Sequence, residues 1–142
     1  MQLPAALVPV VAAGVFGVCG LLAAAALGFL LGDFGAEAGV PRWLMIAVPG
    51  LFAMLFALVV YQGAATRVTT MGQSLSRALL VALLTWLAFS ALATVVWCLP
   101  ENYAACLSNS LVVSGILGGG PLLIGALAAG FIVGTLILRE RQ

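Results

Sequence analysis

The most constraining feature of this 142-residue sequence is that its long apolar stretches contain no Asp, Glu, Lys, Arg or His. Four such stretches cover residues 4–32, 43–62, 78–97 and 110–138. A helix needs about 20 residues to cross the hydrocarbon core of a bilayer. Only 6% of the residues are charged, whereas soluble domains have about 25%. The sequence therefore predicts an all-α membrane protein: a single integral membrane domain, residues 1–142, with four transmembrane helices in an up-down bundle.

The fourth apolar stretch is interrupted by Gly118, Gly119, Gly120 and Pro121. Successive glycines are poor helix formers, and proline ahead of a helix fixes its first turn. We therefore expect the last helix to be broken or kinked near these residues. In the broken form, residues 121–138 cross the membrane and 108–117 form a separate short apolar element. In the continuous form, a helix over 108–138 is about 46 Å long and must tilt, kink or protrude.

The arginines set the expected orientation, because positive residues near the ends of spans are retained on the cytoplasmic side. If both termini are cytoplasmic, only Arg42 of the five basic residues lies outside. The others are then inside: Arg67, Arg77, Arg139 and Arg141. Residues 63–77 are polar and are expected to form a water-exposed loop on this inner side. We expect a multi-pass protein of the cell membrane, the inner membrane in a bacterium, with cytoplasmic N- and C-termini.

Cys98 and Cys106 fall in an outer loop in this orientation. An oxidising exterior favours disulfides, so we expect these two residues to pair. Their spacing is not that of metal ligands. Cys19 lies within the first apolar stretch and is expected to be a free thiol.

Small residues recur at four-residue spacing on the expected helices. Glycines at this spacing let helix backbones approach closely, either between copies of a protein or within one protomer. We interpret them as helix-packing positions. They are Gly28 with Gly32, Gly115 with Gly119, and Gly130 with Gly134, the last pair continuing from Ala126.

Hydroxyl side chains share one face of the third apolar stretch. Ser90 and Thr94 are four residues apart, and Thr85 lies beside that face. One interpretation is that they line a pathway for a neutral solute. The other is that they bond to carbonyls of their own helix or to a neighbouring helix.

The residue types that most catalysis needs are scarce. The chain has no His and no Lys, and its four acidic residues, Asp33, Glu37, Glu101 and Glu140, all flank the apolar stretches. Proton relays and ion-coupled transport sites use ionisable groups within the membrane, and a Ser or Cys nucleophile needs a base. Zinc and haem sites need ligands that are missing here. We expect no enzymatic activity, cofactor or metal site, and the absence of a basic cluster argues against nucleic acid as a partner.

The expected role is that of a non-catalytic accessory or assembly subunit of a membrane complex. Its partners are then the lipid bilayer and other membrane-protein subunits or copies of itself. The alternative is a small oligomeric transporter or channel for a neutral or lipidic solute. In that case Gly118–Pro121 and the hydroxyls of Thr85, Ser90 and Thr94 are expected at the pathway.

Overall fold

The computed structural model describes residues 4–31, 41–98 and 102–139, and all regular structure within these ranges is helical. A short 3-10 helix, η1 (Ala5–Leu7), precedes α1 (Val8–Leu31), which is followed by α2 (Arg42–Val60), α3 (Ala64–Arg67), α4 (Met71–Trp97) and α5 (Tyr103–Arg139). Four of these helices, α1, α2, α4 and α5, are long and apolar enough to cross a membrane. The prediction of an all-helical chain with four span-like helices is confirmed.

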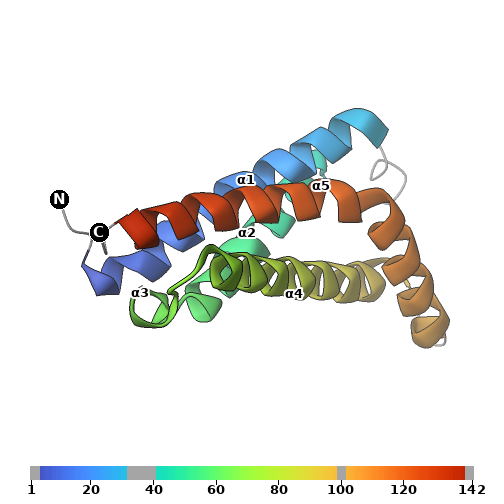
Figure 1. Ribbon diagram of the computed structural model, residues 1–142. Helices are drawn as coiled ribbons and strands as arrows, with labels where there is room; N and C mark the ends of the chain where they lie inside the picture. The colour runs from blue at the N-terminus through green and yellow to red at the C-terminus, as the bar shows by residue number, and fades with distance from the viewer. Residues whose placement is uncertain (1–3, 32–40, 99–101, 140–142) are drawn as a thin grey trace.

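The four long helices pack side by side, with α1 against α2 and α5, and α4 against α2 and α5 (Figure 1). The beginning of α1, the short helix α3 and the end of α5 lie at one end of the bundle. The buried core consists mainly of alanines and valines, such as Ala12, Ala57, Ala78 and Val133. Small side chains of this kind allow helix backbones to approach closely.

Glycines mark the closest approach of helices within each of two helical pairs. In the α1–α2 pair, a β-carbon placed on Gly20 would lie only 3.1 Å from the α-carbon of Gly50. In the α4–α5 pair, a β-carbon on Gly130 would overlap the side chain of Ala78, and one on Gly134 would lie 2.7 Å from Met71 Sδ. A larger residue at any of these positions would push the two helices apart.

The polar stretch 63–77 is more helical than the sequence predicts. Residue Gly63, with φ of 69°, ends the turn after α2 and precedes α3. α4 then begins at Met71, so the expectation of a continuous loop as far as residue 77 is wrong. Thr70 caps this helix by accepting a hydrogen bond from the Gln73 backbone nitrogen, and the Gln73 side chain accepts one from the Thr69 backbone nitrogen at 2.8 Å. This arrangement resembles a capping box, except that Gln73 bonds the residue before the cap rather than Thr70 itself, and it starts a helix among polar residues.

α5 keeps its helical conformation through Gly118–Pro121, so of the two expected forms of the last helix the continuous one is observed and the broken one is not. Membrane helices tolerate proline because neighbouring helices, hydroxyl side chains and local adjustments of the backbone satisfy the groups that it leaves unpaired. With 37 residues α5 is about 55 Å long, longer than the ~30 Å hydrocarbon core. Figure 1 shows the helix changing direction along its length, with its C-terminal part along the bundle and its N-terminal part turning away.

Candidate functional site

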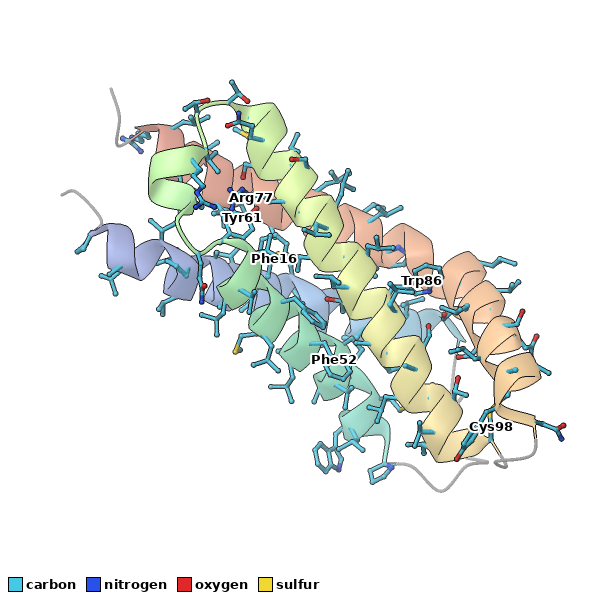
Figure 2. All side chains as sticks on the ribbon, turned by 90° about the horizontal axis from the view of Figure 1, so that it is seen from below. Phe16, Phe52, Tyr61, Arg77, Trp86 and Cys98 are labelled. Carbon is cyan, nitrogen blue, oxygen red and sulfur yellow. A yellow bond between two sulfur atoms is a disulfide. The ribbon has the colours of Figure 1, made fainter. Side chains whose placement is uncertain are left out.

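Tyr61, Ser74 and Gly130 connect three helices at the end of the bundle near α3. The Tyr61 hydroxyl donates to the Ser74 backbone oxygen at 3.0 Å, and the Ser74 hydroxyl donates to the Gly130 backbone oxygen at 2.8 Å. Both side chains are fully buried. The ring of Phe16 packs on that of Tyr61 with 5.5 Å between their centroids (Figure 2). This junction therefore fixes the ends of α1, α2, α4 and α5 relative to one another.

Arg77 stabilises the neighbouring end of α2. Its guanidinium donates a hydrogen bond to the backbone oxygen of Val60, the last residue of that helix. A cation at a helix C-terminus satisfies a free carbonyl and interacts favourably with the helix dipole. The side chain is thus occupied in a structural contact.

A second polar cluster joins α4 to the first part of α5. Trp86 Nε1 donates to Ser114 Oγ at 2.8 Å, and Ser114 Oγ lies 2.9 Å from Ser90 Oγ. The Ser90 backbone oxygen accepts hydrogen bonds from Thr94 at 2.8 Å and from Ser110 at 3.4 Å. The side chains of Ser90 and Thr94 are therefore bonded to the helices themselves, as the second interpretation of the hydroxyls predicts.

Thr85 behaves differently from these hydroxyls. Its side chain is 1% exposed, and its Oγ1 has no hydrogen-bond partner among the residues that the structure describes. It lines a small cavity of about 10 Å³ between the helices, together with Phe16, Cys19, Gly20, Ala53, Leu122 and Gly125 among others. A cavity needs about 10–15 Å³ to hold even one water molecule. The cavity is thus too small for any solute larger than a water molecule.

The proposed pathway residues are not gathered around this cavity. Thr85 lines it, but neither Ser90 nor Thr94 does. Gly118–Pro121 also lie outside it, with Leu122 as the nearest lining residue along the chain. A β-carbon on Gly118 would lie 3.7 Å from Leu27 of α1, whereas one on Gly119 or Gly120 would meet no atom within 4 Å.

The glycines expected at helix contacts occupy different environments. Gly130 and Gly134 contact α4 as described above, and a β-carbon on Gly115 would lie 3.3 Å from the Trp86 ring. One on Gly28 would meet no atom within 4 Å, and Gly32 lies outside the described residues. The tight contact of Gly20 with Gly50 was missed, although Gly50, the one glycine of the second apolar stretch, is the signal that could have indicated it.

Cys98 and Cys106 lie at disulfide distance, with 6.3 Å between their α-carbons, where α4 ends and α5 begins (Figure 2). Cys19 is a free, half-buried thiol on α1. Within the described parts of the chain no three potential metal ligands come together. The acidic residues Asp33, Glu37, Glu101 and Glu140 all lie outside the described residues.

The junction around Ser74 is the feature that sequence reasoning missed. Ser74 falls in the stretch 63–77 that the sequence predicts to be a loop, and nothing in Ser74 or Tyr61 alone indicates that they meet. The available signal was the Thr70–Gln73 spacing, which starts α4 early enough to bury Ser74.

Comparisons with protein-family models, with curated proteins and with solved structures find no significant match to this chain. The class of this protein is therefore inferred from its helices and their composition alone. Four helices long and apolar enough to span a bilayer indicate a multi-pass membrane protein.

Proposed function

We propose that this protein is a non-catalytic accessory or assembly subunit of a membrane complex. The observation that carries the proposal is the closed interior of the protomer. Its cavity of about 10 Å³ is too small for a solute larger than water, and the buried hydroxyls of Ser74 and Ser90 bond across helices, whereas that of Thr85 has no partner among the described residues. Such an interior offers little space for a substrate or for the passage of a solute, which supports a structural role for the protomer.

The outer surface supports the same proposal. At most a third of the residues in each candidate span are buried in the protomer, and large apolar side chains such as Val59, Ile116 and Ile124 are more than 60% exposed. These side chains are suited to contact with lipid and with helices of partner subunits. In this proposal the protein acts through its contacts with partner subunits.

The proposed placement is an up-down bundle in the cell (inner or plasma) membrane with both termini in the cytoplasm. The common location of the start of α1 and the end of α5 in Figure 1 supports the up-down order. The end of the bundle near α3 carries three positive residues: Arg67 on α3, Arg77 near the start of α4 and Arg139 at the end of α5. Positive residues near the ends of spans are retained on the cytoplasmic side, and this supports the proposed orientation.

Thr85 favours a second function, a small oligomeric transporter or channel for a neutral or lipidic solute. A buried hydroxyl without a partner costs stability, and such costs are often retained where a polar group serves a ligand. Because the protomer is closed, the pathway in this alternative would open only in an assembly of several copies.

Purification in a mild detergent, followed by native mass measurement of everything that remains bound, tests the proposal. A second protein in fixed stoichiometry is the expected result. A homo-oligomer without other subunits would favour the transporter, and a monomer without partners would contradict both.

A matched pair of variants sharpens this experiment. Ile124→Ala changes the exposed face of α5, whereas Val133→Ala changes a buried residue of the same helix. Partner binding through the exposed face predicts that Ile124→Ala weakens co-purification without lowering the amount of protein. Val133→Ala should lower the amount of protein and leave the ratio of partner to protein unchanged.

A further inference from the structure

The first part of α5, residues 103–117, is attached to the bundle differently from the rest of that helix. All the residues of α5 that are buried lie between Ala126 and Ile137. At the end of the bundle opposite α3, the first part of the helix turns away from the direction of the remainder (Figure 1). It is therefore held by individual bonds rather than by a buried core.

These bonds connect the segment to α4. The disulfide-distance pair joins Cys106 to Cys98 near the N-terminal end of the segment. Farther along, Ser110 and Ser114 form three hydrogen bonds to α4, two with Ser90 and one with Trp86. The covalent bond is the strongest of these connections, because the hydrogen bonds join neutral groups that are only partly buried.

The residues that follow the segment favour a change in direction. Pro121 has no backbone N–H, so the Leu117 carbonyl cannot form the usual helical bond to it. A β-carbon on Gly119 or Gly120 would meet no atom within 4 Å, so no neighbouring side chain braces the helix at these positions. Glycine also has the greatest backbone freedom of all residues.

We propose that the Cys98–Cys106 disulfide is a redox latch that holds residues 103–117 against α4, and that Gly118–Pro121 form the hinge about which this segment moves when the disulfide is reduced. A dithiol is the required reductant. One thiolate attacks a sulfur of the disulfide to form a mixed disulfide, and its second thiol then displaces the remaining cysteine. The two cysteines gain two electrons and two protons as thiols, and the dithiol becomes a disulfide.

Hydrogen exchange of the full-length protein in detergent, before and after dithiothreitol, tests this proposal. Reduction should speed amide exchange in residues 103–117 by about tenfold or more, because local opening makes their amides accessible. Residues 126–137 should change by less than about twofold, because their buried contacts persist. Equal exchange of residues 103–117 before and after reduction would overturn the latch.

Three variants separate the parts of the proposal. Cys106→Ser should show the fast exchange without reductant, and Cys19→Ser should respond to reductant as the unmodified protein does. The double variant Gly119→Ala, Pro121→Ala stiffens the hinge, and reduction should then have a much smaller effect. A full response from this double variant would overturn the hinge.

A thiol-alkylation measurement covers the case in which Cys106→Ser fails to fold. In oxidised, folded protein Cys98 and Cys106 should resist alkylation until dithiothreitol is added. Ready alkylation without reductant would show that no latch forms and would overturn the proposal, whatever the variants do.

Discussion

At the scale of single residues, Thr85 has the least satisfied environment among the described side chains. Its hydroxyl is buried beside Phe16, Cys19 and Leu122 and has no hydrogen-bond partner. A buried unsatisfied polar group costs about 1–3 kcal/mol. Unlike Ser90, which binds a residue of α5, Thr85 makes no contact that would offset this cost.

Thr85→Val should therefore stabilise the protein by about 1 kcal/mol, because valine keeps the shape and removes the unpaired hydroxyl. Thermal unfolding in detergent measures the change. Ser90→Ala is the matched control at a second buried hydroxyl of the same helix and should destabilise the protein by about 0.5–1 kcal/mol, because its hydrogen bond to Ser114 is lost. Destabilisation by Thr85→Val would mean that the hydroxyl has a bound partner.

Gly130 and Gly119 provide a second contrast between residues of one helix. Gly130→Leu should reduce the amount of folded protein strongly, with a cost of about 3 kcal/mol or more, because its side chain would occupy the position of Ala78. Gly119→Leu should change stability by less than about 1 kcal/mol, because the space beside it is open. The amount of membrane-inserted protein in cells measures both. Equal losses would contradict the difference in packing.

At the scale of helices, the residue at which α4 begins determines which side chains are buried between α4 and α5. The cap formed by Thr70 and Gln73 extends α4 to Met71 and so brings Ser74 and Ala78 against Gly130. A helix that began at Ala78 would leave the Ser74 hydroxyl in a loop. The cap thereby determines the contact between α4 and α5.

Thr70→Val should cost about 1 kcal/mol, the usual cost of losing an N-cap hydroxyl. Amide exchange in the first turn of α4 should become faster as well. Ser76→Ala is a suitable control, because its exposed hydroxyl only bonds back to the Gln73 backbone oxygen. If both variants behaved alike, the cap would not be what starts the helix.

At the scale of the whole molecule, the gathering of arginines at one end of the bundle predicts that this end and both termini face the cytoplasm. A reporter fused after Gln142 should be active in the cytoplasm, and one inserted near Glu37 should be active outside. An exported C-terminus would contradict the proposed orientation.

The four long helices can be predicted from hydropathy and charge, because a bilayer requires apolar helices of a set length. The absence of charge within four stretches is sufficient for four helices, and two cysteines flanking Pro100 are sufficient to suggest a pair. The early start of α4 was not predicted, because it depends on the Thr70–Gln73 cap within a stretch that is polar throughout. The burial of Ser74 was not predicted, because it depends on a glycine of α5 that lies 56 residues away in sequence. The sequence alone left open whether the last helix is broken or continuous at Pro121, because glycine and proline disfavour a helix in water but are tolerated in membrane helices.

The double role of Ser74 has a consequence for biogenesis. Its backbone oxygen accepts a hydrogen bond from Tyr61, which is synthesised earlier, while its hydroxyl donates to Gly130 of α5, which is synthesised later. Until α5 enters the membrane, the Ser74 hydroxyl lacks its acceptor on Gly130, and the surface of α4 around Ala78 is not covered by α5. A chain truncated before α5 would keep the Ser74 hydroxyl without its acceptor and the surface of α4 around Ala78 uncovered.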